Sequence, residues 1–307
     1  MTDVDRFITQ TSSLETLSAH ERAIQAATGK LSRAQLDLLL DAFERACCEQ
    51  GETRYRVYWQ RQLVAWFRGE EQQADAFAEL MRGVPLPADR CRICDLNFEI
   101  RRIAQRGDYE RALRLSEPIL SGAIGCDTAP ARTYPSLLYP LLHVGRKVDA
   151  ERCFRAGRVA FDEDPPRSKY AGDFLRYLAL VEAWDEGIAL LERHLAPPEA
   201  YALPSDAFAV YEGAWLLTEK LRQDGREHVA LHALEPLPVA NLERRGVSTA
   251  ELADWVWSEL TRIAREYDRV NETPRFAEML ASTAELLNQS FTPRAVDEPT
   301  PTPEGAS

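Results

Sequence analysis

The chain has 307 residues, of which 45% are hydrophobic and 28% charged; this composition is ordinary for a folded protein and excludes disorder of the whole chain. Its 37 basic and 49 acidic residues give a formal net charge of -12, which disfavours nucleic acid as a general partner. No stretch is long and apolar enough to span a bilayer, and the first residues lack the pattern of a secretory signal. We therefore expect no membrane partner and a cytoplasmic location.

The predicted elements begin with an N-terminal helical cap over residues 1–52, made of two helices within 13–50 that are broken near Gly29. Residues 53–236 then read as helix pairs separated by segments rich in proline or glycine. The helices are predicted near 53–68 and 70–82, 92–106 and 108–121, 131–144 and 147–161, 168–182 and 184–195, and 205–222 and 226–234. Longer helices near 248–270 and 274–289 form C-terminal capping helices within 237–290, and the proline- and threonine-rich residues 291–307 are predicted to be a disordered tail.

Small residues recur along the paired region at a nearly constant spacing. The pairs Gly69/Ala74, Gly107/Ala112 and Gly145/Ala150 follow one another at 38 residues, and Glu182/Gly187 and Gly225/Ala230 continue the pattern less regularly. A period of this length is typical of a superhelical array of helix pairs, in which each repeat packs mainly on its neighbours.

Two of the turns carry a more specific pattern. The segment Gly107-Asp108-Tyr109-Glu110-Arg111-Ala112-Leu113 resembles the turn of a tetratricopeptide repeat, and residues 145–150 repeat it. The chain also resembles uncharacterised bacterial tetratricopeptide-like proteins in which a CxxC precedes one repeat and a third cysteine precedes the next. The resemblance implies an all-α fold, a right-handed α-solenoid of helix hairpins, but it supplies no activity. A non-repetitive helical bundle is the alternative.

The resemblance also implies which side chains line the concave face, because the first helix of each pair faces inward in this family. Through the middle three repeats the inward positions hold four basic residues and no acid, although the protein as a whole is acidic. Together with aromatic side chains they predict a basic and aromatic groove that binds an acidic peptide or protein. The predicted partner-binding residues are Arg56, Trp59, Trp66, Asn97, Arg101, Arg132, Tyr139, His143, Lys169, Arg176 and Trp215. The alternative is that the arginines are solvated or paired with nearby acids and the tryptophans belong to the core.

Three cysteines fall at one end of the predicted stack. Cys91 and Cys94 form a CxxC at the start of one helix, and Cys126 precedes the next first helix. A structural zinc ion normally has four ligands, and here the fourth is unknown: Cys153, Cys47, Cys48 or a histidine could supply it. Simple burial of the thiols is the alternative, and a redox motif fits poorly in a helical fold.

No motif of a known catalytic centre occurs in the chain, so we expect no enzyme and no obligatory cofactor, with zinc as the one possible metal. His228 and His232 are spaced for one helix face but lack a further ligand. The leading hypothesis is a non-catalytic scaffold, an adaptor or regulator, that binds a protein or peptide in its groove. The alternatives are a sensor of a small anionic peptide or signal ligand and a zinc-stabilised thiol protein; an anionic tail could also occupy the groove. The sequence does not define the oligomeric state.

Overall fold

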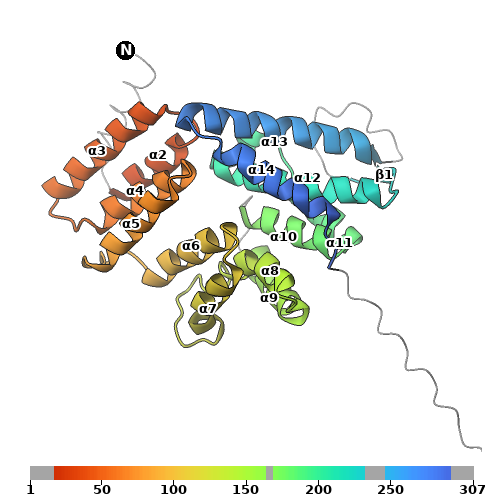
Figure 1. The fold of residues 1–307 in the computed structure, drawn as a ribbon, viewed down its shortest axis with the longest axis horizontal. Helices are drawn as coiled ribbons and strands as arrows, with labels where there is room; N and C mark the ends of the chain where they lie inside the picture. Colours follow the sequence, from red (N-terminus) through yellow and green to blue (C-terminus); the bar gives the residue numbers. More distant parts are fainter. Residues whose placement is uncertain (1–16, 164–168, 232–245, 292–307) are drawn as a thin grey trace, which may run out of the picture.

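The computed structural model describes residues 17–163, 169–231 and 246–291, and these residues form an all-α fold (Figure 1). The first helices are α2 (Leu17–Ala27), α3 (Arg33–Glu49), α4 (Tyr55–Phe67), α5 (Glu71–Arg82), α6 (Arg92–Gln105), α7 (Tyr109–Leu120), α8 (Tyr134–His143) and α9 (Lys147–Glu163). They are followed by α10 (Lys169–Leu180), α11 (Trp184–His194), the 3-10 helix η1 (Pro198–Ala200), α12 (Pro204–Gln223), α13 (Thr249–Asn271), α14 (Arg275–Glu285) and η2 (Leu286–Asn288). The all-α class is confirmed for the described part of the chain, in which no helix is long and apolar enough to cross a membrane.

The residues that end the first helix of each pair share one backbone conformation. Gly69, Gly107, Gly145 and Gly225 have φ between +72° and +82°, and Glu182 takes the same left-handed conformation with φ of +59°. Glycine adopts this conformation without the steric cost that a side chain brings, and it commonly ends helices. The period seen in the sequence therefore marks a repeated turn, including the turn where glutamate replaces glycine.

The prediction of a helix over 226–234 is wrong. His228 and Val229 form strand β1 (His228–Val229), which pairs antiparallel with β2 (Val247–Ser248). Backbone hydrogen bonds join the chain beyond Gly225 to this later segment, including one from the N–H of Thr249 to the Glu227 carbonyl. The hydrophobic periodicity of residues 226–234 cannot reveal a strand partner that lies elsewhere in the sequence. His228 thus lies in a strand rather than on a helix face, and His232 lies outside the described residues, as does the predicted tail after residue 291.

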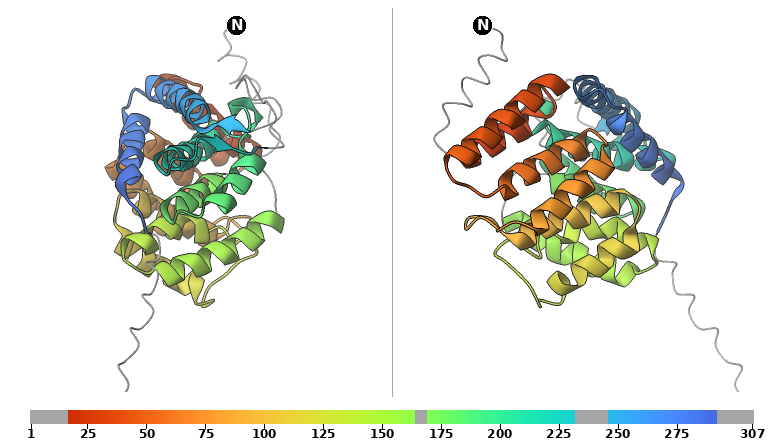
Figure 2. Two further views of the ribbon diagram at one scale, coloured as in Figure 1. Left: turned by 90° about the vertical axis from the view of Figure 1, so that its right-hand side faces the viewer. Right: turned by 60° about the vertical axis from the view of Figure 1, so that its left-hand side comes forward.

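The C-terminal helices do not simply extend the stack, because they return to the first helices of the chain. Figure 1 shows α13 running along the top of the molecule toward α2 and α3, and Figure 2 shows the same arrangement from two further sides. The Asn271 side-chain amide donates to the Thr28 carbonyl at 2.7 Å, and the Thr273 hydroxyl donates to the Arg68 carbonyl at 2.9 Å. The helices are therefore arranged as a closed ring.

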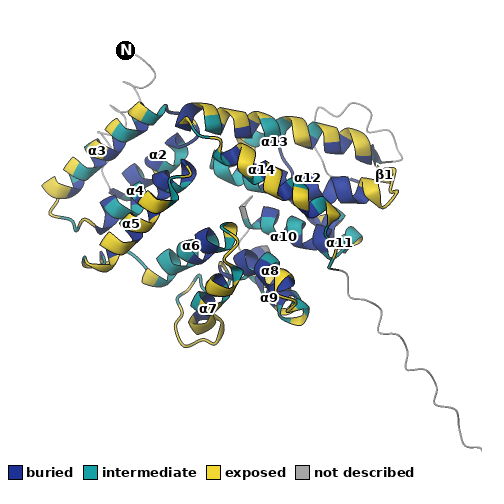
Figure 3. Cartoon of the chain, viewed as in Figure 1, coloured by how far each residue is buried: buried dark blue, intermediate teal, exposed yellow. Residues whose placement is uncertain are grey.

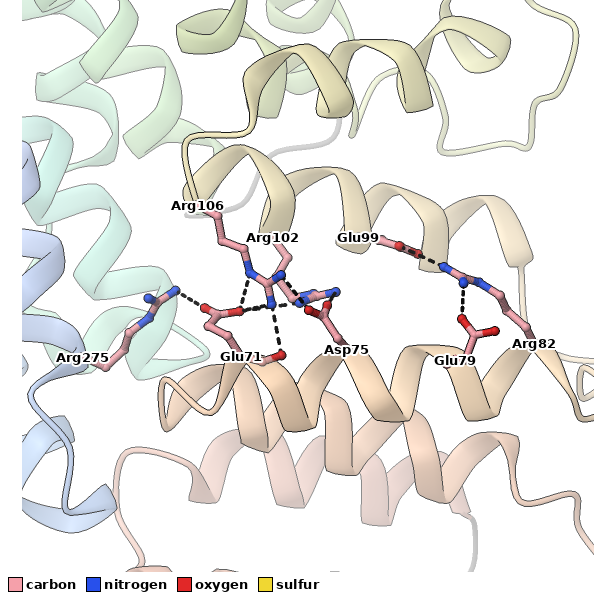
Figure 4. A network of polar contacts seen from close by, with 8 residues as sticks. All are labelled: Glu71, Asp75, Glu79, Arg82, Glu99, Arg102, Arg106 and Arg275. Carbon is pink, nitrogen blue, oxygen red and sulfur yellow. Dashed lines mark hydrogen bonds and ion pairs between the residues drawn. The ribbon is translucent and has the colours of Figure 1, made fainter.

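A network of ion pairs joins α5, α6 and α14 on the rim of this ring (Figure 4). Arg102, whose side chain is 2% exposed, donates to Asp75 at 2.6 Å, and Arg106 donates to Glu71 at 2.6 Å and to Asp75 at 2.9 Å. Glu71 also lies 3.0 Å from Arg275 at the start of α14. One carboxylate on α5 thus links the neighbouring hairpin to the returning C-terminal helix.

The buried side chains form a continuous core through most of the ring, whereas exposed residues lie on the outer faces of α3, α5, α7 and α13 (Figure 3). A separate cluster joins α2 and α3 to the outer face of α4 through Val57 and Val64. The cap thus packs on the first helix of the paired region, which is the helix whose other side faces the centre of the ring.

Candidate functional site

A cavity of about 460 Å³ lies at the centre of the ring. Its walls come from α4, α6 and α12, from the start of α14, and from the loops before α6 and α8. The aromatic lining residues are Trp59, Trp66, Phe67, Phe98, Tyr170, Phe208 and Phe276, and Met279 adds a flexible apolar side chain. The C-terminal helix α14 thus supplies part of the wall beside the helices that were predicted to face the groove.

A second cavity of about 420 Å³ adjoins the first and has a more polar wall. The two share Arg101, Gln105, Glu212 and Met279 as lining residues. The Tyr139 hydroxyl lies in this second space and donates to Gln289 at 3.2 Å.

Arginines at the predicted inward positions are paired with acids from other helices. Arg101 donates to Asp173 on α10 at 2.7 Å, and both side chains are 12% exposed. Arg176 donates to Glu212 on α12. Acidic partners therefore stand on the inner wall beside the basic residues, at positions 72 and 36 residues away in sequence. For Arg101 and Arg176 the partners are therefore not the acids three or four residues away that the alternative interpretation of the sequence named, whereas Arg56 does lie 3.5 Å from Glu52, four residues before it.

Arg101 keeps its charge in this buried position. Burial, the largest influence, lowers the pKa of the guanidinium, but the carboxylate of Asp173 outweighs it and the pKa is raised overall. Arg56 is similarly surrounded: it lies 3.1 Å from Glu21 and also pairs with Asp89. These arginines stabilise the protein's own acids, which reduces the positive charge available to a ligand.

Arg132 differs from these arginines. Its side chain is exposed, it lines the first cavity, and no ion pair joins it to a residue in the described ranges. Asn97 also lines the cavity, and its buried Oδ1 atom accepts no hydrogen bond within the described part of the chain. These two groups are the clearest polar contacts for a ligand on this wall.

The remaining predicted residues lie in several places. Trp59 lies under the Arg90 guanidinium at 4.4 Å, and Trp66 packs on Phe67 with ring centroids 4.7 Å apart. His143 is exposed beside Tyr109, with centroids 4.5 Å apart. Trp215 packs on Trp257 outside both cavities, with the rings tilted by 35° and their centroids 4.6 Å apart. Arg56 lines neither cavity, and the side chain of Lys169 is not among the side chains that the structure describes.

The structure brings Cys91, Cys94 and Cys126 together, with their sulfur atoms all within 4.8 Å of one another. Cys91 is the residue immediately before α6, and Cys94 lies in the first turn of that helix. Cys126 returns to this point through a tight turn, in which the Ala129 N–H donates to the Cys126 carbonyl at 3.2 Å. Among the described residues no fourth histidine, cysteine or carboxylate joins this group, so neither Cys47, Cys48 nor Cys153 completes it.

Thr128 contacts two of these thiols. Its Oγ1 lies 3.2 Å from the Cys94 sulfur and 3.5 Å from the Cys126 sulfur, and the two sulfurs are 3.8 Å apart. Burial raises the pKa of Cys94 to about 11. Burial also acts on Cys126, but hydrogen bonds from the Thr128 hydroxyl and from the N–H groups of Thr128 and Ala129 outweigh it and lower its pKa to about 7.

Several lining residues were not predicted from the sequence. Phe98 lies one helical turn after Cys94, so the CxxC pattern itself could have indicated it. Phe208 comes from α12, which was predicted to face the groove but through other positions, and Met279 comes from α14, which was predicted to close the end of the stack. Comparison with known protein families finds no family model that matches the chain, and comparison with curated proteins finds no relative.

Proposed function

We propose that the protein is a binding protein that takes up a small ligand in the central cavity, and that its helices form a tetratricopeptide-like solenoid whose concave face is closed by α12 to α14. The repeated left-handed turns at the ends of the first helices support the solenoid. The position of the cavity, surrounded by the first helices and the returning C-terminal helices, is the single observation that supports ligand binding best.

The size and lining of the cavity favour a small molecule. A volume of about 460 Å³ falls in the range of small-molecule sites, whose walls are mostly apolar with a few polar groups that orient the ligand. Trp59, Phe98 and Phe208 offer flat apolar surfaces, while Arg132 offers a cation and Asn97 an acceptor. The ligand that fits has an aromatic or apolar body and an anionic group.

A protein that binds a small ligand in a cavity corresponds to the predicted sensor of a small anionic ligand and not to the predicted scaffold for an acidic peptide. An extended acidic peptide needs an open wall with unpaired cations, whereas Arg101 and Arg176 already pair with Asp173 and Glu212. Binding of this kind requires no catalytic group from the chain, and the proposed activity is non-catalytic.

The test is to fill the cavity. Met279 is half-buried and lines both cavities, so Met279→Trp reduces the space, while Ala281→Trp adds the same side chain at an exposed position of the same helix. Small molecules are released by denaturing each purified protein and identified by mass spectrometry. We expect one compound from the wild type and from Ala281→Trp, and at least tenfold less from Met279→Trp. Equal amounts from all three proteins would contradict the proposal, as would the absence of any released compound together with failure of anionic aromatic compounds to raise the melting temperature.

A second candidate function is zinc binding by Cys91, Cys94 and Cys126. Two sulfurs that each lie about 2.3 Å from a tetrahedral zinc ion are about 3.8 Å apart, and the sulfurs of Cys94 and Cys126 have a separation of 3.8 Å. We expect stoichiometric zinc by elemental analysis of protein purified under reducing conditions, and loss of that zinc in Cys94→Ser. Cys48→Ser, at an exposed cysteine outside the cluster, is the control and should keep its metal. Absence of zinc from the wild-type protein, after exposure to the ion, would contradict this candidate.

A further inference from the structure

The cysteine cluster and the central cavity are parts of one site. Cys91 and Cys94 line the cavity, and so do Thr128 and Ala129 from the turn that carries Cys126. The cluster therefore lies at the wall of a space large enough for a small molecule, whereas a purely structural metal would be enclosed by the protein.

The set of ligands around this point is incomplete. Zinc that serves a structural role has four protein ligands, and zinc that binds a reactant has three and an open position. Near Cys91 and Cys94, Asp95 accepts from Tyr55 at 2.6 Å and from Arg90 at 3.1 Å, and Asp89 pairs with Arg56. Asp127, which follows Cys126, is exposed and does not join the cluster. Among the residues that the structure describes, no other histidine, cysteine, aspartate or glutamate joins the three thiols as a possible metal ligand.

We infer that zinc held by Cys91, Cys94 and Cys126 presents its fourth coordination position to the central cavity, and that this position binds the sulfur of a small thiol. The inference rests on both parts of the proposed function, the cavity and the metal. In the binding step the sulfur of the thiol replaces a zinc-bound water molecule, and the proton of the thiol passes to the solvent. No bond to carbon changes and nothing is oxidised or reduced.

The chemistry of the wall favours a thiol over an activated water molecule. Three thiolates make a soft site, and a thiol that coordinates zinc loses its proton without the help of a base. Activation of water would be assisted by a free carboxylate, but Asp95, Asp89 and Glu212 on this wall are each paired with an arginine. The fourth carboxylate of the wall, Asp206, also interacts with another group of the protein. The observed groups therefore suit capture of a thiolate better than hydrolysis.

The surroundings define the rest of the ligand. Phe98 lies four residues after Cys94 on the same helix and packs against Trp59 with ring centroids 5.9 Å apart, so an apolar body attached to the sulfur meets aromatic rings. Arg132 follows Thr128 by one turn, with its N–H donating to the Thr128 carbonyl at 3.0 Å, and lines the same cavity. The substrate class is thus a low-molecular-weight thiol with an apolar body and an anionic group.

The experiment uses the full chain loaded with Co²⁺, whose absorption reports the number of thiolate ligands, in a phosphine reductant that adds no thiol. Benzyl mercaptan is the probe, and benzyl alcohol is the control of the same shape. We expect the sulfur-to-cobalt charge-transfer band to rise by about a third as three thiolates become four. We also expect about one proton released per site and no spectral change with benzyl alcohol.

The variant Asn97→Trp places an indole within the cavity wall one turn from Cys94, at a side chain whose Oδ1 makes no hydrogen bond. It should bind cobalt with unchanged stoichiometry and benzyl mercaptan at least tenfold more weakly, while Ala281→Trp should behave like the wild type. If the protein binds one cobalt ion per chain but benzyl mercaptan does not change the spectrum, the open coordination position is disproved, although metal binding by the three cysteines is not. An equal response to benzyl alcohol would overturn the choice of sulfur. Failure of the wild-type protein to bind cobalt would contradict the metal site and with it this inference. The ligand-release measurement on Met279→Trp tests the cavity independently of the metal.

Discussion

Two helix contacts in the ring are built in opposite ways. Between α10 and α12, Gly172 and Gly213 bring the backbones together, and a Cβ on Gly172 would overlap the carbonyl oxygen of Ala209. Between α5 and α6, the contact is made by long side chains, with Arg102 and Arg106 paired to carboxylates. The first contact depends on shape and the second on charge, so the two should respond to different perturbations.

The difference also follows from where each contact lies. Leu175 and Val210 beside the glycines are completely buried, so water cannot fill a gap there. Asp75 on the rim is 51% exposed at its side chain, so water and salt reach the ion pairs. A mutation that adds one methyl group should therefore be more damaging in the first contact than the loss of a charge in the second.

The largest effect is expected for Gly172→Ala. The new Cβ overlaps the Ala209 backbone, which cannot move aside as a side chain could, and we expect the free energy of unfolding to fall by about 3 kcal/mol. Gly83→Ala is the control, because its nearest atom, the Leu80 carbonyl oxygen, lies at 3.6 Å. Denaturant unfolding measures both variants. If Gly172→Ala were as stable as the wild type, the close-packed contact would be disproved.

The next effect is expected for Arg102→Met. The side chain is 2% exposed, and its removal leaves Asp75 and Glu71 with fewer partners, so we expect a loss of about 2 kcal/mol in the free energy of unfolding. Arg114→Met breaks an exposed pair with Glu110 four residues away and should cost less than about 0.5 kcal/mol. If the two variants lost the same free energy of unfolding in denaturant, burial of Arg102 would not strengthen its ion pairs.

The pH dependence separates the two contacts. Burial raises the pKa of Asp75, but hydrogen bonds from Arg106 and Arg102 outweigh it and hold the pKa below its ordinary value of 3.8. The stability contributed by Asp75 is therefore complete above that value and is lost as the pH falls through the lower folded-state pKa. In unfolding measured below pH 4, Asp75→Asn should flatten the acid loss of stability, whereas Gly172→Ala should leave its slope unchanged. If the stability of Asp75→Asn fell with decreasing pH as steeply as that of the wild type, the contribution of the Asp75 charge to the α5–α6 contact would be contradicted.

Salt should produce the smallest change. At 1 M ionic strength the screening length is about 3 Å, so the partly exposed pairs on the rim weaken. We expect the cost of Arg102→Met to shrink by less than about 1 kcal/mol in 1 M NaCl, while the cost of Gly172→Ala stays constant. A salt-dependent cost for the glycine variant would mean that its contact is not governed by shape.

Much of the helical layout could be predicted from the sequence, because helix ends are determined locally. The recurrence of glycine predicted turns that the structure has at Gly107 and Gly145, and the same turn forms at Glu182 despite the missing glycine. The strand at His228 could not be predicted, since its partner Ser248 is 20 residues away. Closure of the ring was equally hidden, because it depends on contacts between opposite ends of the chain.

The candidate site could likewise be predicted only in part from the sequence. Convergence of Cys91, Cys94 and Cys126 is confirmed, since segments that precede successive first helices fall at one end of a helical array. The inward positions of the middle three repeats were predicted to hold no acid, but Asp173 on α10 lies on the inner wall and pairs with Arg101, because the count along single helices does not include its position.

The contact between Asn271 and Thr28 also constrains how the molecule is made. These residues are separated by 243 positions, so during synthesis α2 and α3 leave the ribosome long before their partner in α13 exists. Until then the slot over Gly29, which the Tyr267 ring fills in the folded protein, stays open to solvent. The cavity can only be completed after translation has passed α14, so a chain truncated before that helix lacks a wall of its binding site and leaves apolar surface for chaperones to recognise.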